Sequence, residues 1–153
     1  PQQTQSHMLL GTIYDIQKQY DLSEKHYRAA LEINPDFAPA ANNLAYLLST
    51  HDKNIDEAMA LAQKAKEKLP KDPNVMDTLG WIYYKKGLYG NAIAEFTDAL
   101  EKIPDNAIVQ YHLGMAYYKR GDQEQAKETL EKALRLDDKF DGAEEARRIL
   151  AEL

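Results

Sequence analysis

The sequence contains no cysteine, which excludes disulfide bonds, thiolate nucleophiles and cysteine metal ligands. It also lacks any apolar run near the roughly 20 residues that a membrane-spanning helix needs. Basic residues are outnumbered, with 19 lysines and arginines against 25 aspartates and glutamates, so the formal net charge is -6. Nucleic acid is a poor partner for such a chain, because phosphate backbones bind basic faces. The absence of cysteine suits both cytosol and periplasm, so a cytoplasmic and a periplasmic or envelope-associated location both stay open.

Catalytic and metal-binding motifs are missing as well. No HExxH, CxxC, glycine-rich phosphate loop or GxSxG occurs. The four histidines are His7, His26, His51 and His112. They lack the spacing of a metal site or a catalytic triad, so packing or surface roles suit them better. An acidic run at residues 137–141 only partly resembles a calcium loop, because it lacks alternate ligands and a distal glutamate. The sequence therefore predicts a protein that is not an enzyme and holds no cofactor and no metal.

What the sequence does contain is a skeleton of apolar and small residues that recurs at a nearly constant interval. In residues 73–106 the skeleton is Leu79, Gly80, Tyr83, Ala92, Phe96, Ala99 and Pro104. One of its positions is occupied in turn by Ser23, Ala58, Ala92 and Ala126, which lie 35, 34 and 34 residues apart. Self-similarity at this period predicts a stack of repeated units. Gly80 and Ala92 are small where two helices have to approach closely, so a larger side chain at Gly80 should cost about 1 to 3 kcal/mol.

This skeleton resembles that of the tetratricopeptide repeat family over nearly the whole chain. Aligned to the family, the repeats are residues 4–37, 38–72, 73–106 and 107–140, within a single domain of residues 1–153. The resemblance implies an all-α fold, with an antiparallel pair of helices, A and B, in every repeat. It also implies a right-handed superhelical solenoid whose inner, concave face is lined by the A helices. Residues 141–153 carry an apolar stripe with charge elsewhere, and predict a further helix that covers the last repeat, with Asp141 as its N-cap.

The resemblance also implies which A-helix positions face the concave groove. The expected partner-binding residues are Asn42, Tyr46, Asp77, Trp81, Tyr84, Lys85, Tyr111, Met115, Tyr118 and Lys119. Five of them are aromatic, and exposed aromatic side chains with a polar tip are favoured binding anchors. The alternative is that these rings pack on one another and fill the groove. A clamp for a terminal carboxylate is not expected, because its basic positions hold Met8, Thr12, Asn74 and Thr78 in this chain.

Members of the family mostly bind other proteins, so the leading hypothesis is a non-catalytic adaptor that holds a peptide or helix of another protein in its groove. A second hypothesis is self-association into dimers or filaments through the apolar N-terminal edge around Leu9, Leu10 and Ile13. A third is the docking arm of a larger enzyme. The chain begins at Pro1 without methionine, so we expect it to be cut from a longer protein. It is also similar to bacterial multi-repeat proteins, some of them associated with envelope assembly or polysaccharide export.

Overall fold

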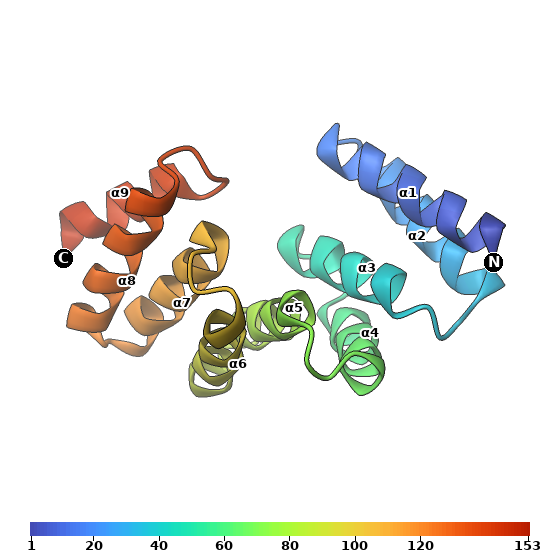
Figure 1. Cartoon of the computed structure of the whole chain (residues 1–153). Helices are drawn as coiled ribbons and strands as arrows, with labels where there is room; N and C mark the ends of the chain where they lie inside the picture. Colours follow the sequence, from blue (N-terminus) through green and yellow to red (C-terminus); the bar gives the residue numbers. More distant parts are fainter. The chain divides into compact units, whose positions relative to one another are not determined.

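The computed structural model describes residues 1–153 and contains nine α-helices and no strand (Figure 1). The helices are α1 (Gln2–Ile16), α2 (Tyr20–Ile33), α3 (Ala38–Thr50), α4 (Ile55–Lys68), α5 (Pro73–Lys85), α6 (Tyr89–Lys102), α7 (Ala107–Arg120), α8 (Gln123–Leu136) and α9 (Ala143–Glu152). The all-α fold that the repeat period predicts is confirmed.

The helices are organised as hairpins. α1 packs against α2, α3 against α4, α5 against α6 and α7 against α8, and two to four residues connect the two helices of each hairpin. The hairpins also stack, because α2 packs against α3 and α6 packs against α7. An A helix such as α3 or α7 is therefore covered both by its own B helix and by the B helix that precedes it.

The chain divides into two compact units. Unit 1 is Pro1–Lys71 and holds α1 to α4, and unit 2 is Asp72–Leu153 and holds α5 to α9. The division falls one residue before the expected limit between the second repeat (38–72) and the third (73–106). At this point Asp72 caps α5, since its Oδ1 accepts a hydrogen bond of 2.8 Å from the backbone N–H of Asn74. The expected repeat limits and the single domain over residues 1–153 stay predictions.

Glycine lets the two helices of a hairpin approach closely. The pairs of a glycine on the A helix and a large side chain on the B helix are Gly11 with Tyr27, Gly80 with Phe96 and Gly114 with Leu130. A methyl group at Gly80 would lie 2.6 Å from Cε1 of the buried Phe96 ring, far inside van der Waals contact. The close approach expected at Gly80 therefore brings this glycine against the Phe96 ring.

The second repeat fills the same space with different residues. Its A helix has Ala45 where the other repeats have glycine, and its B helix has Ala62 where they have a ring or a leucine. Both alanines are fully buried. A smaller partner on the B helix leaves room for the extra methyl group on the A helix, so the volume is exchanged between the two positions.

The last helix begins later than the sequence predicts. α9 starts at Ala143, and the residue before it is Gly142 with a φ of 110°, so Asp141 is not its N-cap. A side chain at Gly142 would be strained by this left-handed backbone. It would also meet Tyr111, because a Cβ atom there would lie 2.6 Å from Cε1 of that ring. The chain reaches α9 by passing directly over Tyr111.

Candidate functional site

The ten expected partner-binding residues are divided between the two units. Asn42 and Tyr46 lie on α3 in unit 1, and the other eight lie on α5 and α7 in unit 2. In unit 1 both residues are half-buried. The Asn42 amide donates a hydrogen bond of 3.3 Å to Oδ1 of Asn43. Unit 2 therefore holds most of the candidate site, and its geometry decides what the site offers.

Trp81 is the centre of a stack of rings in unit 2. Its ring lies 4.8 Å from that of Tyr84, with an interplanar angle of 12°, and 4.4 Å from that of His112. Only 9% of Trp81 is exposed, and its buried indole Nε1–H has no hydrogen-bond partner. The Nζ atom of Lys85 lies 5.5 Å from the centre of the Trp81 ring, within the range of a cation–π contact. Trp81 holds its neighbours in place and presents little surface of its own.

His112 and Asp77 join α7 to α5 beneath this stack. Nδ1 of His112 lies 2.7 Å from a carboxylate oxygen of Asp77, and His112 is 2% exposed. Phe96 lies 5.6 Å from the His112 ring, so the imidazole is enclosed by aromatic groups apart from its carboxylate partner. The packing role that the sequence favours for His112 agrees with this burial. Asp77, one of the expected partner-binding residues, is engaged inside the unit.

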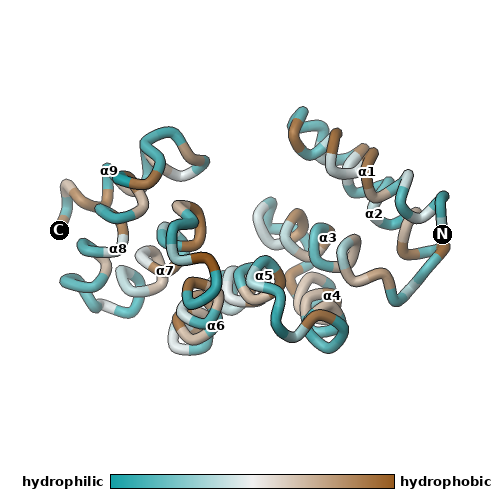
Figure 2. The backbone as a smooth tube through the Cα atoms, viewed as in Figure 1, coloured by the Kyte–Doolittle hydropathy of each residue, from teal (hydrophilic) through white to brown (hydrophobic).

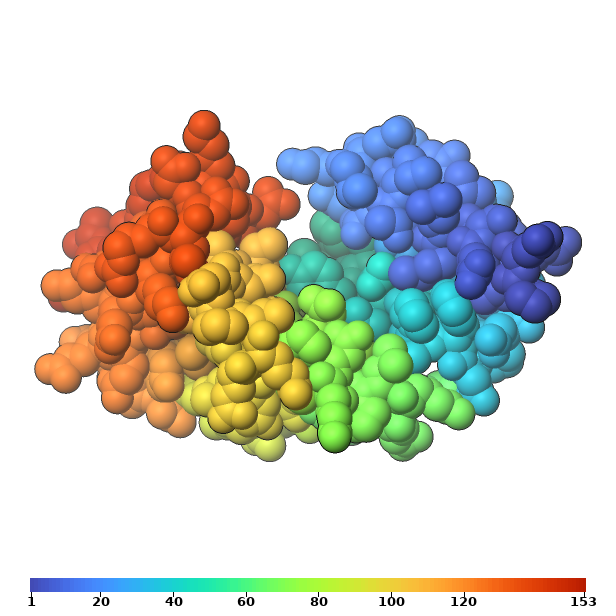
Figure 3. Space-filling model, viewed as in Figure 1, coloured from blue at the N-terminus to red at the C-terminus, as the bar shows by residue number.

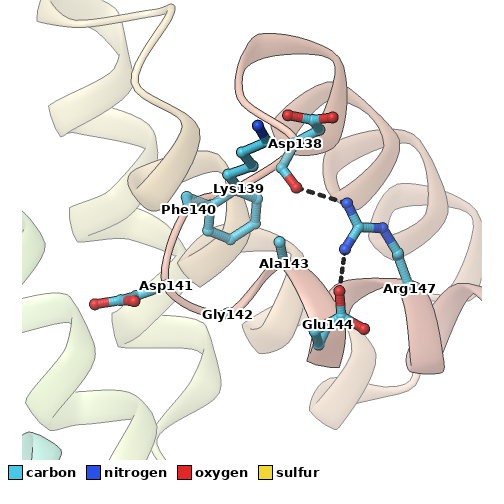
Figure 4. Close-up of a pocket in the computed structure, with 8 residues that line it drawn as sticks. All are labelled: Asp138, Lys139, Phe140, Asp141, Gly142, Ala143, Glu144 and Arg147. Carbon is cyan, nitrogen blue, oxygen red and sulfur yellow. Dashed lines mark hydrogen bonds and ion pairs between the residues drawn. The ribbon is translucent and has the colours of Figure 1, made fainter.

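Tyr111 and Met115 are covered by the C-terminal part of the chain. Tyr111 lies 5.3 Å from the ring of Phe140, and both residues belong to a buried cluster that includes Ala146 and Ile149 of α9. Tyr111 is 9% exposed and Met115 is 6% exposed. Figure 4 shows Phe140 and Gly142 in the connection that precedes α9. The sequence did predict that a last helix would cover the final repeat, but it did not indicate that Tyr111 would be the residue beneath it.

Besides the half-buried Asp77, four residues of the candidate site in unit 2 keep part of their surface: Tyr84, Tyr118, Lys85 and Lys119. Lys119 is exposed, and the other three are half-buried. The Tyr118 hydroxyl donates a hydrogen bond of 3.0 Å to Glu152 of α9, and Lys119 Nζ lies 5.9 Å from the centre of the Tyr118 ring. These four side chains combine two phenol rings with two cations.

The expectation of exposed aromatic side chains is therefore wrong for Trp81 and Tyr111, and the expected binding residue Met115 is buried as well. The alternative, in which the rings pack on one another, describes Trp81 and Tyr111. The physical reason is that unit 2 has two sources of cover that a repeat skeleton does not specify. His112 stacks on Trp81 from the next A helix, and Phe140 with α9 closes over Tyr111.

The tyrosines of this site are poor acids. Burial raises the pKa of Tyr84 and of Tyr111 to about 12 in each case. The hydrogen bond that Tyr118 donates to Glu152 raises the pKa of Tyr118, since it stabilises the protonated hydroxyl. All three phenols therefore act as neutral hydrogen-bonding groups at neutral pH, and the positive charge of the surface comes from Lys85 and Lys119.

The residues around the start of α9 form a cavity of about 420 Å³, which Figure 4 shows. It is lined by Asp138, Lys139, Phe140, Asp141, Gly142, Ala143, Glu144 and Arg147. The Arg147 guanidinium donates a hydrogen bond of 2.6 Å to the Asp138 carbonyl and pairs with Glu144. These two contacts of Arg147 tie α9 to the connection that precedes it.

Metal ligands do not gather in the structure. In unit 1 the Nδ1 atoms of His7 and His26 lie 2.9 Å apart, and the imidazole of His26 stacks on Tyr14 at 5.4 Å. No group of three or more histidine, cysteine, aspartate or glutamate residues is placed to hold a metal ion. None of the helices combines the length and the low polarity needed to cross a bilayer.

Comparison with known proteins gives the family. Three family models, each described as tetratricopeptide repeat, match residues 4–37, 26–60 and 83–153. A TPR repeat-containing protein of Pseudomonas aeruginosa is 37% identical over 78 residues. This match covers 50% of the chain but only 13% of that relative, so the chain spans a small part of its length.

Solved structures share the fold. A thermophilic TPR protein of Thermus thermophilus superposes with a TM-score of 0.81 at 23% identity, over 97% of this chain and 80% of that one. The pilF protein of Pseudomonas aeruginosa gives a TM-score of 0.77 at 22% identity, over 99% of this chain and 76% of its own. Both organisms are bacteria, in agreement with the bacterial resemblance of the sequence. With its helical hairpins, its repeat period and its three matching family models, the chain belongs to the tetratricopeptide repeat proteins.

Proposed function

We propose that this protein is a non-catalytic adaptor and that unit 2 binds a segment of another protein on the surface formed by Tyr84, Lys85, Tyr118 and Lys119. The TPR fold supports a protein-interaction scaffold, and the solved relatives with this fold are generally non-catalytic. The finer proposal is carried by one observation. Tyr84 and Tyr118 keep part of their surface while buried rings fix their positions, as Trp81 does for Tyr84.

Such a surface favours a partner segment with apolar or aromatic side chains. Tyrosine anchors bury a large area with only two rotatable side-chain angles, so little conformational entropy is lost on binding. Stacking on Trp81 limits the rotation of Tyr84 before any partner arrives, which lowers the cost further. Lys85 and Lys119 add positive charge at the edge, where they favour an acidic residue in the partner. Trp81, Asp77, Tyr111 and Met115 support this surface from beneath.

The proposal can be tested with peptides selected on residues 1–153 from a displayed library of random sequences. For a peptide that binds, we expect Tyr84→Ala and Tyr118→Ala each to raise Kd by about tenfold or more. Tyr20→Ala, on α2 of unit 1 and outside the expected site, is the matched control, and Tyr46→Ala tests whether unit 1 contributes. Circular dichroism checks that each variant keeps its helices. Peptides whose affinity is the same for both variants of unit 2 and for the unchanged protein would remove this surface from the proposal.

A second candidate function is self-association through the N-terminal edge of unit 1. The observation that favours it is the exposure of large apolar side chains on α1: Leu9 is 61% exposed and Ile16 is 76% exposed. Light scattering over a range of concentrations tests it, because a chain that does not self-associate keeps a constant mass.

A further inference from the structure

We infer that His7 of α1 and His26 of α2 form a pH-sensitive contact within the first hairpin of unit 1. The contact holds the two helices together while the pair of imidazoles carries at most one positive charge, and it is weakened when both imidazoles are charged. This inference goes beyond the proposed function, because it concerns unit 1 and needs neither a bound partner nor a second copy of the chain.

The two imidazoles meet between α1 and α2. Their Nδ1 atoms lie 2.9 Å apart and their ring centres lie 5.1 Å apart, so the two nitrogens face each other. The ring of His26 also stacks on Tyr14 of α1, at 5.4 Å and with an interplanar angle of 15°. Figure 2 traces α1 and α2 side by side, and the two helices pack on each other. The histidine pair is therefore part of the contact that forms the hairpin.

One hydrogen bond links the pair when both imidazoles are neutral. One Nδ1 carries a hydrogen and donates it, and the other Nδ1 accepts it with its lone pair. A first added proton leaves this bond intact, because it can bind to the outer nitrogen of the donor ring. A second proton has to bind to the accepting Nδ1, since the other nitrogen of that ring already carries a hydrogen. The second protonation therefore removes the hydrogen bond and brings two positive charges together.

The surroundings of the pair do not offset a second charge. Burial, the charge of His7 and the charge of Lys25 together lower the pKa of His26, and burial contributes most. The one charged residue of α1 is Asp15, about two helical turns after His7. α3, which also packs against α2, has no charged residue. The other charged residues of α2, none of which pairs with either imidazole, are Asp21, Glu24, Arg28 and Glu32.

The direction of the response follows from the pKa of His26. An unfolded histidine has a pKa of about 6.5, and the pKa of His26 is lower in the folded chain. The folded chain therefore binds fewer protons than the unfolded chain in this range. The stability that the neutral imidazole contributes is complete above about pH 6.5 and is lost as pH falls through the folded pKa.

The carboxylates of unit 1 do not produce the same response. Glu24 and Glu57 stay ionised in this range, because hydrogen bonds from Lys53 and Arg28, respectively, lower their pKa values. Burial raises the pKa of Asp15, so protonation of Asp15 favours the folded chain. A loss of stability between about pH 7 and pH 5 is thus opposite in sign to the effect of Asp15.

The response should be confined to the first hairpin. Both imidazoles are half-buried, and Figure 3 shows the atoms of α1 (dark blue) at the surface of unit 1, so protons reach the pair in the folded chain. Histidine is the side chain that ordinarily titrates near neutral pH, and no other repeat has a histidine at either position. The equivalent residues are Ala41 and Leu61 in the second repeat, Met76 and Glu95 in the third, and Gln110 and Thr129 in the fourth.

The pair itself is tested by proton NMR of the histidine rings of residues 1–153 between about pH 4.5 and pH 8. His7 and His26 should titrate in two coupled steps, because the first charge on the pair makes the second harder to add. His7→Gln should raise the pKa of His26, since it removes the neighbouring charge. Independent titration of the two rings, with the same pKa for His26 in His7→Gln as in the unchanged chain, would overturn the pair.

The effect on the helices is measured by amide hydrogen exchange, corrected for the pH dependence of the chemical step. From about pH 7 to pH 5, opening of α1 should become about threefold more frequent, and opening of α6 in unit 2 should not change. His7→Gln and His26→Gln should each remove most of this pH dependence, because an amide does not take up a proton. His51→Gln is the matched control, since His51 lies 4.0 Å from the ring of Tyr20 in the same unit but contacts no second histidine.

Two further results would contradict the inference. Coupled titration without any change in the opening of α1 would show that the pair does not hold the hairpin together. If His51→Gln removes the pH dependence of α1 as fully as His7→Gln does, the response belongs to another group. Circular dichroism separates loss of the contact from loss of the fold, and the use of both His7 and His26 guards against a single damaging substitution. Peptide binding by unit 2 is measured separately, so failure of this inference leaves the proposed function standing.

Discussion

The first A helix of unit 1, α1, and the last A helix of unit 2, α7, differ in how much of their surface other segments cover. In unit 1 the first helix, α1, carries a stripe with Leu9 and Ile16 largely exposed. In unit 2 the last A helix, α7, has Tyr111 and Met115 nearly enclosed, because Phe140 and α9 pack over them. Both helices follow the same repeat skeleton. The cover over Tyr111 and Met115 comes from the segment that follows the repeat, whereas the exposure of Ile16 is shared by its equivalent on α7, Lys119.

The composition of the end helices matches this difference. α9 has charged residues at five of its ten positions and buries Ala146 and Ile149 on the side that faces the unit. Arg148 of α9 pairs with both Glu145 and Glu152 of the same helix. α1 has one charged residue in fifteen positions. The outer side of α9 is therefore charged, whereas α1 presents apolar side chains to solvent.

The largest expected effect comes from alanine substitution of two isoleucines, one on α9 and one on α1. Ile149 of α9 is fully buried and Ile16 of α1 is 76% exposed. We expect Ile149→Ala to lower the free energy of unfolding by about 2 to 5 kcal/mol, because it removes buried methyl groups and leaves a cavity. Ile16→Ala should change it by no more than about 0.5 kcal/mol in the monomer. Urea unfolding at low protein concentration measures both. Equal losses for the two variants would mean that α9 does not cover unit 2.

The second largest effect is expected at alkaline pH, which should lower the free energy of unfolding of unit 2. The pKa of Tyr84 and of Tyr111 is raised to about 12 by burial, whereas an unfolded tyrosine ionises near about 10. The neutral phenols stabilise the fold fully below the unfolded pKa, and this contribution is lost as pH rises from about 10 toward about 12. Each tyrosine then costs up to about 1.4 kcal/mol per pH unit. Urea unfolding at about pH 9 and pH 11 measures the slope, and Tyr111→Phe should remove about half of it. A slope that is unchanged in Tyr111→Phe would show that this phenol is accessible and not covered by α9.

Alanine substitutions at two glycines with similar backbone conformations distinguish the packing of the connection before α9 from the cost of backbone strain alone. Gly142 and Gly121 have φ of 110° and 96°, but only Gly142 has a ring beside its Cα. We expect Gly142→Ala to cost about 1 to 3 kcal/mol more than Gly121→Ala, because the new methyl group meets Tyr111 while the methyl group at position 121 meets nothing. Thermal unfolding of both variants gives the difference. If the two costs are equal, the connection before α9 does not pack on Tyr111.

Much of the fold could be predicted from the sequence because its signal is local and repeated. The interval between equivalent positions fixes the number of hairpins, and Gly80 marks a close helix contact. The third repeat pairs Gly80 with Phe96, and the second repeat has Ala45 and Ala62 at these positions. In the sequence, these two alanines appear only as two unrelated small residues. Their meaning depends on knowing that the positions face each other, which the structure supplies.

The candidate site was less predictable, because it depends on contacts between residues that the repeat skeleton treats as equivalent. The skeleton assigns Trp81 and Tyr111 to the groove, but the stacking of His112 on Trp81 occurs in one repeat only. Asp77 and His112 are 35 residues apart and occupy different positions of their repeats, so no motif joins them. The apolar stripe of residues 141–153 predicted a covering helix, and Phe140 just before it was the one signal that the cover would extend to an aromatic ring.

The hydrogen bond between Tyr118 and Glu152 of α9 should contribute least to the stability with which α9 packs on unit 2. The Tyr118 hydroxyl donates a hydrogen bond of 3.0 Å to Glu152, whose side chain remains 47% exposed, so water competes for the same carboxylate. We expect Tyr118→Phe to lower the free energy of unfolding by at most about 1 kcal/mol, since a solvent-accessible hydrogen bond exchanges for one with water. Hydrogen exchange of the α9 amides is the sensitive measurement, because opening of α9 alone does not need the unit to unfold. Exchange should quicken at α9 and not at α6. If Tyr118→Phe lowers the free energy of unfolding as much as Ile149→Ala does, α9 is held mainly by this hydrogen bond. The difference in exposure between α7 and α1 would then depend on one polar contact rather than on apolar packing.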